Sequence, residues 1–437
     1  MSRFRPIDRS TDYLLPPSVQ EWLPQSHLAR YVVDVVEGLD LTKLERAYAG
    51  RGSDAYHPAL LLSLLIYGYA TGTHSSRKIE RATYDSLAFR FIACDQHPDH
   101  DTLANFRRRF GGELGAIFVQ VLQVARENPL SRFGTVSLDG TKLRANASKH
   151  SALSYGHAEK IEAQLKAEVQ EMLKLAEAAD RSALPEGIHL PDEIKRREDR
   201  LAAIAAAKAE YEAKLAQRKA KASATGKRPG GKPPVPPTAG PRSGDQVNLT
   251  DDESRIMKVA GGGFEQCYNA QAAVDADSML VLAPHVTQAS NDKEQVAPMV
   301  EKVRANPGGL NQPATWLADS GYYSEKNVAT CVAAQIEPLI AVKRDEHHPH
   351  WRERFEEPTP LEGPARHVER MRHALKTKAG RAAYALRKQT VEPVFGIIKS
   401  VLGFRQFLLR GLENVRNEWT LVCLAWNLKR MTVLRPQ

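Results

Sequence analysis

Three acidic residues, Asp139, Asp319 and Glu392, are the strongest candidates for chemistry in this chain of 437 residues. The two aspartates directly follow short β-type runs, 136–138 and 316–318, and the glutamate stands among helix formers. In an open α/β sheet the ligand crevice lies beyond the strand ends, so both aspartates are well placed for a ligand. Taken singly, an Asp-Gly step is more often a turn, so the prediction depends on all three residues. A fold that brings them together would create a magnesium site suited to phosphate chemistry.

The residues around Glu392 support the same chemistry. Lys388 precedes the glutamate by four positions and Lys399 follows it by seven, which places all three close to one face of a helix. A carboxylate that holds a metal ion, flanked by cations that hold phosphates, is what a centre that cuts phosphodiesters requires. Pro393 lacks the N–H that a helix interior uses, so we expect a kink with Glu392 at the bend.

The composition is that of a globular protein with an anionic partner. Hydrophobic residues make up 42% and charged residues 26%, and the formal net charge is +9. The length predicts two or three domains, and the charge favours nucleic acid without proving it. The four cysteines are far apart in sequence with no paired spacing, which argues against a zinc knuckle or a disulfide framework and favours buried, reduced thiols: Cys94, Cys267, Cys331 and Cys423. No signal peptide pattern is present, and the longest apolar run, 59–69, is shorter than the roughly 20 residues of a membrane span. These features predict a soluble, cytoplasmic protein with no membrane partner.

Residues 1–130 predict an all-α domain, because amphipathic runs are separated by Gly and Pro. Two short helices are expected in succession over 75–93 and 99–110, the second with Asp101 or Thr102 as its N-cap. This order resembles a helix-turn-helix, whose second helix enters the major groove. The alternative, a helix with a solvated basic face, remains equally open. The basic side chains in question are Arg107, Arg108 and Arg109.

A change of composition separates residues 154–246 from the rest of the chain. Strong helix formers with Glu and Lys at helical spacing predict an antiparallel helical hairpin, followed by a Pro-, Gly- and Lys-rich linker. This block is either an insertion that the function tolerates or an arm that grips DNA, and the first interpretation is favoured.

Strand patterns lie on both sides of this block, within residues 131–437. One strand is expected around Asp139, and four more around 264–275, 279–289, 314–322 and 336–344, with helices near 293–306 and 325–335. A last helical region is expected over 377–431. The predicted fold class is α/β, with a mixed sheet interrupted by the helical block and preceded by an all-α domain.

Four segments resemble the DDE-type transposases of bacterial insertion sequences. They are SLDGTKLRANAS around Asp139, DDESRIMK from Asp251, LADSGYYS around Asp319, and YALRKQTVEPVFGIIK around Glu392. The resemblance covers nearly the whole chain and implies an InsH-like N-terminal domain and a ribonuclease H-like catalytic domain. It implies cleavage and strand transfer at the terminal inverted repeats of a mobile element. The cofactor would be Mg²⁺, for which Mn²⁺ can substitute.

The resemblance also assigns site residues and partners. Asp139, Asp319 and Glu392 would be catalytic and would hold the metal ions. Tyr384, Arg387 or Lys388, and Lys399 would contact the terminal DNA phosphates. Arg387 satisfies the spacing from the tyrosine and Lys388 the spacing to the glutamate, so which of them holds the phosphate is open. The implied partner is double-stranded DNA, both inverted repeats and target, bound by a homodimer in the nucleoid of a bacterial cytoplasm.

Two other functions remain as alternatives: a non-catalytic DNA-binding protein derived from a transposase, and a ribonuclease H-like nuclease without strand transfer. Minor candidates receive structural interpretations. The histidines at 347, 348 and 350 favour a surface loop, the acidic residues 251–253 a capping or turn run, and Asp275 and Asp277 a hairpin turn. Trp419 and Trp426 are expected in a core.

Overall fold

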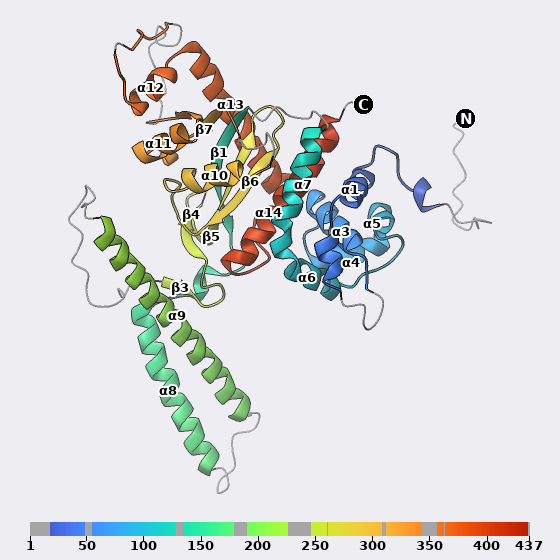
Figure 1. Cartoon of the computed structure of the whole chain (residues 1–437). Helices are drawn as coiled ribbons and strands as arrows, with labels where there is room; N and C mark the ends of the chain where they lie inside the picture. The colour runs from blue at the N-terminus through green and yellow to red at the C-terminus, as the bar shows by residue number, and fades with distance from the viewer. Residues whose placement is uncertain are drawn as a thin grey trace, which may run out of the picture.

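The computed structural model describes residues 18–48, 55–127, 134–178, 190–225, 246–259, 261–307, 312–342, 356–361 and 363–435. The histidines at 347, 348 and 350 and the linker at 226–245 lie outside the described residues. The described part contains a helical N-terminal region, a mixed β-sheet with helices on it, and a helical hairpin that projects from the sheet (Figure 1). The expected α/β class, with helices preceding a mixed sheet, is confirmed.

The N-terminal region is all helical, and α3 is its centre. Proline at the first position and the His57 side chain, which accepts a hydrogen bond from the Ala59 N–H, begin this helix. Almost every side chain of α3 is buried, because α1, α5 and the C-terminal α14 all contact it. The elements are η1 Val19–Glu21, α1 Leu28–Glu37, α2 Thr42–Arg46, α3 Pro58–Ala70, α4 Ser76–Asp85, α5 Leu87–Ile92, α6 His100–Arg109, η2 Gly111–Glu113 and α7 Leu114–Glu127.

Two details of this region differ from the prediction. The segment expected to be one helix over 75–93 is two, α4 and α5, because Ser86 has an extended backbone between them. The N-cap of α6 is Asp99, whose carboxylate accepts from the Thr102 N–H at 2.6 Å, and not Asp101 or Thr102. An aspartate two residues earlier has the extended conformation that a cap requires.

The sheet has six strands, with β1 Thr135–Arg144 at its centre. On one side β1 pairs antiparallel with β5 Phe264–Asp275, which in turn pairs antiparallel with β4 Arg255–Lys258 and β6 Val281–Thr287. On the other side β1 pairs parallel with β7 Thr315–Ala318, and β7 with β8 Glu337–Ile340. All five predicted strands are present. The turn between β5 and β6 is also as predicted, since Asp275 accepts from the N–H and hydroxyl of Ser278.

Helices cover the sheet and connect it to the N-terminal region. The connecting helices are α10 Val296–Arg304, η5 Ser320–Tyr322 and α11 Glu325–Ala333, followed by α12 His367–Ala374, α13 Lys378–Ser400 and α14 Leu412–Leu434. α14 lies between β6 and the helices α3 and α7 (Figure 1). Trp419 and Trp426 are buried in this layer, as predicted, and donate to the carbonyl groups of Gln271 and Met279. One continuous hydrophobic core therefore runs from the N-terminal helices to the sheet.

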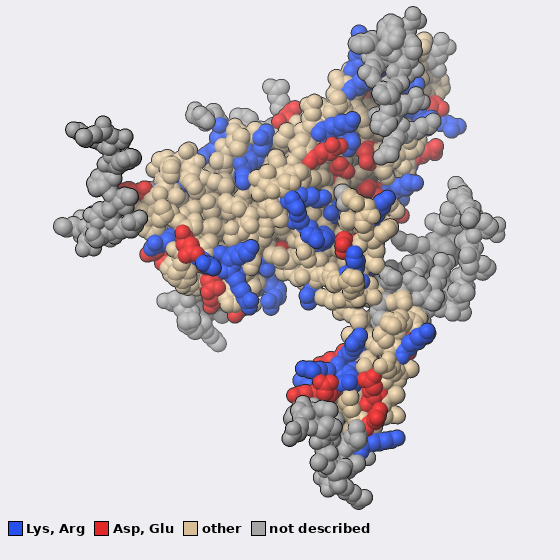
Figure 2. All heavy atoms as spheres, turned by 180° about the vertical axis from the view of Figure 1, so that it is seen from behind, with Lys and Arg blue, Asp and Glu red and all other residues tan. Residues whose placement is uncertain are grey.

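The predicted antiparallel hairpin is present as α8 Tyr155–Ala178 and α9 Leu190–Thr225. Glu162 pairs with Lys208 at 2.6 Å and Glu168 with Arg197 at 2.8 Å, which fixes the antiparallel register. At its base, β2 Ala152–Ser154 pairs with β3 Gln246–Asn248. The small hydrophobic clusters of the hairpin are separate from the main core. On the face seen in Figure 2, basic and acidic side chains of the hairpin are interspersed.

Three further observations complete the comparison. α13 runs without interruption through Pro393, so the proline does not end the helix. Cys267, Cys331 and Cys423 are buried thiols as predicted, but Cys94 is exposed, because it lies in a tight turn with a positive φ of 51°. Among the helices of the described ranges, none combines the length and apolar character that crossing a membrane requires.

Candidate active site

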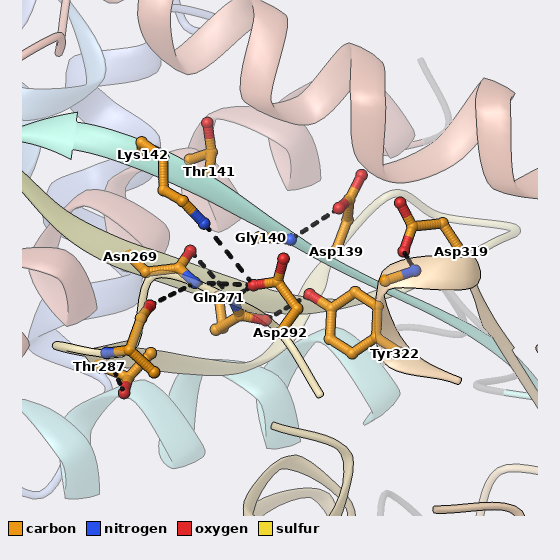
Figure 3. Close-up of polar contacts among 12 residues, drawn as sticks. Asp139, Gly140, Thr141, Lys142, Asn269, Gln271, Thr287, Asp292, Asp319 and Tyr322 are labelled. Atoms are coloured by element: carbon orange, nitrogen blue, oxygen red, sulfur yellow. Dashed lines mark hydrogen bonds and ion pairs between the residues drawn. The ribbon is translucent and has the colours of Figure 1, made fainter. Parts of the chain in front are cut away.

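Asp139 and Asp319 lie side by side because of the register of two parallel strands. The last paired residues of β1 and β7 are Leu138 and Ala318, and each is followed directly by an aspartate. Neighbouring strands are about 4.8 Å apart, so the two aspartates occupy adjacent positions at the end of this pairing. Figure 3 shows the two carboxylates close to each other, beneath the helix that crosses above β1.

The Asp139 carboxylate is held in a largely buried position. Its side chain is 19% exposed, and Oδ1 accepts a hydrogen bond from the Gly140 N–H at 2.7 Å. Burial raises the pKa of Asp139 to about 7, and the charges of Asp319 and Asp292 act in the same direction. The Gly140 N–H and the Arg387 guanidinium oppose this rise. Two carboxylates confined in this way favour a nearby cation.

Helix α13 brings Glu392 near Asp139, and Arg387 of the same helix lies between the two carboxylates. The Arg387 guanidinium lies 3.5 Å from Asp139 Oδ2 and 3.1 Å from Glu392 Oε1, so it bridges the two carboxylates. Arg387 is 12% exposed, whereas the Glu392 side chain is 49% exposed. The three predicted acidic residues thus converge on one region, with Asp139 and Asp319 adjacent and Glu392 joined to them by an arginine.

The basic residues of α13 differ in where they point. Lys399 contacts the Thr141 hydroxyl on β1, two positions from Asp139, and burial lowers the pKa of its ammonium group. Arg387 faces the acidic residues. Burial of the guanidinium acts to lower the pKa of Arg387, but the charges of Tyr384 and the nearby acids outweigh it and raise this pKa. Lys388 is exposed. Arg387 is therefore the residue with access to the carboxylates, and Lys388 faces solvent.

Asp292 is a fourth carboxylate of this region, which the sequence did not indicate. It lies in the loop between β6 and α10, and its Oδ1 accepts from Asn269 at 2.7 Å and Gln271 at 2.8 Å (Figure 3). Lys142 is 3.9 Å from the same oxygen. Gln271 also accepts a hydrogen bond from the Tyr322 hydroxyl, which follows Asp319 by three residues. The sequence signal that could have indicated this network is the presence of two amide residues, Asn269 and Gln271, in an otherwise alanine-rich strand; both are fully buried.

Gly140 leaves space for this network. A Cβ atom at this position would lie 2.1 Å from Gln271 Nε2 and 2.9 Å from Asp292 Oδ1, so no larger residue fits without displacing them. The glycine after Asp139 therefore has a packing function, and a turn is not formed there, because β1 continues to Arg144.

The three arginines of α6 do not share one environment. Arg107 is half-buried, donates to the Tyr69 hydroxyl at 2.8 Å and interacts electrostatically with the buried Glu418. Arg109 donates to the Ala47 carbonyl and stacks on aromatic rings. Arg108 is exposed.

The acidic run 251–253 has the structural role that was predicted. Asp251 is buried and accepts from the Tyr268 hydroxyl at 2.8 Å. Glu253 accepts from the Leu412 N–H at 2.7 Å, at the start of α14. These carboxylates accept hydrogen bonds from β5 and from the start of α14, and they have a structural role there.

Asp139 and Asp319 are oxygen donors of the kind that hard divalent cations prefer, but they do not form a complete ligand set in this arrangement. Asp139 and Asp319 supply oxygen ligands from neighbouring strands, and Asp139 is buried at a cost that a cation would offset. In the described residues, no three Asp, Glu, His or Cys side chains are grouped closely enough to hold a metal ion. Arg387 supplies the positive charge between Asp139 and Glu392 in this arrangement.

Two family models match the chain. The model described as Transposase DDE domain matches residues 234–428, and the model described as Transposase domain (DUF772) matches residues 17–109. No curated protein matches the chain, and no solved structure does. The first match contains Asp319, Glu392 and the strands β5 to β8, and the second contains most of the N-terminal helices. Since the two models describe the two parts of a transposase in their expected order, the chain belongs to the DDE-type insertion-sequence transposases.

Proposed function

We propose that this transposase cleaves DNA strands at the terminal inverted repeats of its mobile element and joins the freed 3′-hydroxyl to target DNA. The observation that carries the proposal is the β1–β7 register, which sets Asp139 beside Asp319 beneath a helix that brings Glu392 and Arg387. Family membership supports the reaction class, and the geometry supports the residues.

Asp139, Asp319 and Glu392 would hold Mg²⁺, which Mn²⁺ can replace. When bound, the metal would supply a Lewis acid for the phosphate oxygens and would lower the pKa of the attacking water or hydroxyl group. Asp139 is pre-positioned for this task by its strand and by the Gly140 N–H. The rigid strand ends hold the two aspartates without further ordering, which favours transition-state binding.

The cations of α13 would bind the DNA. Arg387 has two N–H edges, now engaged by Asp139 and Glu392, and would turn one of them to a phosphate when DNA and metal bind. Lys399 is set beside Thr141 and would neutralise charge that develops at the scissile phosphate. Lys388 and Tyr384 would contact flanking phosphates of the terminal DNA.

The remaining parts would recognise and pair the DNA ends. We assign residues 1–130 to sequence recognition, with Arg108 and Arg109 as the exposed arginines of α6, and residues 131–437 to catalysis. The hairpin block 154–246 interrupts the catalytic part. Two chains would act on two element ends, as a homodimer assembled on DNA.

Strand cleavage with purified protein tests the proposal. The DNA on both sides of the gene is sequenced to identify terminal inverted repeats, and the substrate is a labelled duplex that carries them, incubated with Mg²⁺ or Mn²⁺. We expect cleavage by the wild type and a loss of at least about 10³-fold in Asp139→Asn, Asp319→Asn and Glu392→Gln. The matched control is Asp277→Asn, an exposed turn aspartate, which should cut normally. Equal cutting by all four variants would refute the assignment.

The same assay separates the other functions. Addition of a target plasmid should give joined products that begin at the 3′-hydroxyl of the element. Cleavage without joining would indicate a nuclease, and binding without cleavage would indicate a non-catalytic DNA-binding protein.

A further inference from the structure

A segment that follows α13 is hydrogen-bonded to the C-terminal end of β1. Residues 405–410 lie beside residues 144–146, where Phe407 N–H donates to the Arg144 carbonyl at 2.9 Å and the Asn146 amide to the Leu408 carbonyl at 2.7 Å. Gln406 donates to the Ala145 carbonyl at 3.1 Å. The buried rings of Phe404 and Phe407 anchor the segment from below. β7 pairs only with the first part of β1, residues 135–138, and this segment pairs in parallel with β1 at Arg144.

Four cations follow this seam, and we call them the basic ridge: Arg144, Lys399, Arg405 and Arg410. Arg405 Nε donates to the Lys399 carbonyl at 3.0 Å, and Arg410 Nε donates to the Asn146 carbonyl at 3.0 Å. Each guanidinium is thus fixed by its Nε, while both side chains remain exposed. A guanidinium held in this way can present its two Nη groups to a phosphate at little further entropic cost.

The ridge is not neutralised by neighbouring acids. Over the described ranges, no carboxylate lies within ion-pair distance of any of its four cations, whereas the nearby Lys142 and Lys149 pair with Asp292 and Glu265. Burial raises the pKa of the Cys267 thiol to about 11, and the charges of Arg144 and Lys399 oppose that rise. Cys267 is also the residue that pairs with Arg144 across β5 and β1. Unpaired cations gathered in one place favour a polyanion.

The ridge starts at the candidate active site and leads away from it. Lys399 contacts Thr141, two residues after Asp139, and Arg410 is tied to Asn146, seven residues after Asp139. Seven residues of a strand span roughly 23 Å. This length corresponds to several successive phosphates of one DNA strand, whose rise is about 3.4 Å per nucleotide in a duplex.

We propose that the basic ridge binds the sugar–phosphate backbone of duplex DNA on one side of the scissile phosphate. The proposal rests on the proposed function for the direction of the DNA, since it places the cleavage point at Asp139. It assigns Arg144, Arg405 and Arg410 to DNA binding without sequence readout, because their partners would be phosphates. The ridge ends shortly before the helical hairpin begins at β2, so the bound duplex leaves the catalytic region toward the base of that hairpin.

The salt dependence of DNA binding tests this inference. The probe is a short fluorescein-labelled duplex of mixed sequence, and its affinity for the full chain is measured by anisotropy over a series of salt concentrations. Each lost phosphate contact reduces the slope of log K against log salt by about 0.9. The double variant Arg405→Ala/Arg410→Ala should therefore lose about 1.8 from the slope and bind more weakly at every salt concentration.

Matched variants make the result specific. Arg304→Ala/Arg372→Ala removes the same charge from two exposed positions outside both the ridge and the N-terminal recognition part, and should keep the wild-type slope. Arg405→Lys/Arg410→Lys keeps the charge and should restore most of the slope, with weaker binding than the wild type because the fork is lost. Circular dichroism verifies that each variant is folded.

Two results would overturn the inference. One is a slope for the ridge double variant equal to that of the control pair. The other is a reduced slope with an RNA hairpin and an unchanged slope with DNA, which would assign the ridge to RNA. Strand cleavage is measured in parallel, so that the two proposals can fail separately. If the wild type cuts DNA but the ridge double variant keeps the wild-type slope, only the ridge proposal is refuted. If the double variant has a reduced slope but the wild type does not cut, only the proposed function is refuted.

Discussion

The buried position of Asp139 makes its ionised form costly for the stability of the fold. Its pKa is raised to about 7 by burial and by the charges of Asp319 and Asp292. A carboxyl group with a raised pKa contributes stability that is present below its unfolded pKa near 4 and lost as the pH rises through about 7. The ionised form at neutral pH is therefore a cost that a bound cation would offset.

Asp139→Asn should stabilise the fold while it abolishes cleavage. At about pH 8 without divalent ions, we expect the free energy of unfolding to rise by up to about 4 kcal/mol, since the amide carries no charge. The gain should shrink as the pH falls from about 7 to about 4, where the wild-type acid is protonated in both states. Urea unfolding at several pH values measures this. A variant less stable than the wild type at every pH would contradict the pKa assignment.

Gly140→Ala should damage both stability and catalysis. The added Cβ would lie 2.1 Å from Gln271 Nε2 and would push the amide away from Asp292 and Tyr322. We expect a loss of about 1–3 kcal/mol, typical of overpacking. Gly134→Ala is the control, because nothing lies within 4 Å of its Cβ position and its backbone is not strained. Thermal unfolding of the two variants should differ clearly, and equal melting temperatures would show that the network tolerates displacement.

At the residue scale, the sequence indicated the aspartates but not their neighbours. Asp139 and Asp319 each follow a strand, and strand ends are readable from local pattern. Asp292 lies in a loop and reaches the site only through the packing of β5 and β6, which no local pattern encodes. The inward position of Arg107 likewise depends on Tyr69 and Glu418, which are far from it in sequence.

At the element scale, local sequence pattern predicted that α13 is a helix but not how the helix lies on the sheet. Its start was predicted, since the last helical region was expected from 377, and the Thr377 hydroxyl caps it by accepting from the Gly380 N–H at 3.0 Å. Its end at Ser400 was not predicted, because the expected region continued to 431. Which of Arg387 and Lys388 faces the acids was not predictable, because it depends on how the helix lies across β1. The uninterrupted course through Pro393 shows that tertiary packing of Val391, Val394 and Phe395 outweighs the lost hydrogen bond.

Removal of the hairpin should leave the sheet folded. Ser154 and Gln246 pair across β2 and β3, so residues 155–245 can be replaced by an Asn-Gly turn. The clusters inside the hairpin are separate from the main core, and we therefore expect the shortened chain to unfold within a few degrees of the full chain, about 2–4 °C. Calorimetry measures this. A collapse of the main transition would show that the hairpin supports the catalytic core.

At the scale of the whole molecule, a buried charge network joins the N-terminal helices to the catalytic part. Glu418 on α14 is fully buried and accepts from the Tyr69 hydroxyl at 2.8 Å and from the N–H groups of Leu408 and Leu409 at 2.9 and 3.0 Å. Arg107 on α6 completes the network through Tyr69. The order of the parts was readable from the sequence, but their shared core was not, because α14 is distant in sequence from α3 and α7.

Glu418→Ala should destabilise the whole chain. The substitution leaves Arg107 without its counter-charge and two backbone N–H groups without an acceptor, at a cost of about 3 kcal/mol. Glu301→Ala, at an exposed position of α10, should change stability by less than about 0.5 kcal/mol. Urea unfolding followed by tryptophan fluorescence compares them. If the two variants were equally stable, the network would not connect the two parts energetically.

The central claim is that Asp139, Asp319 and Glu392 share a divalent cation. A crystal of the full chain grown with Mn²⁺ and a duplex bearing an inverted repeat, measured at the manganese absorption edge, tests it directly. The account predicts anomalous density between Asp139 and Asp319, with Glu392 within coordination distance and Arg387 turned to a phosphate. Density elsewhere in the molecule, or a site whose ligands exclude both aspartates, would contradict it.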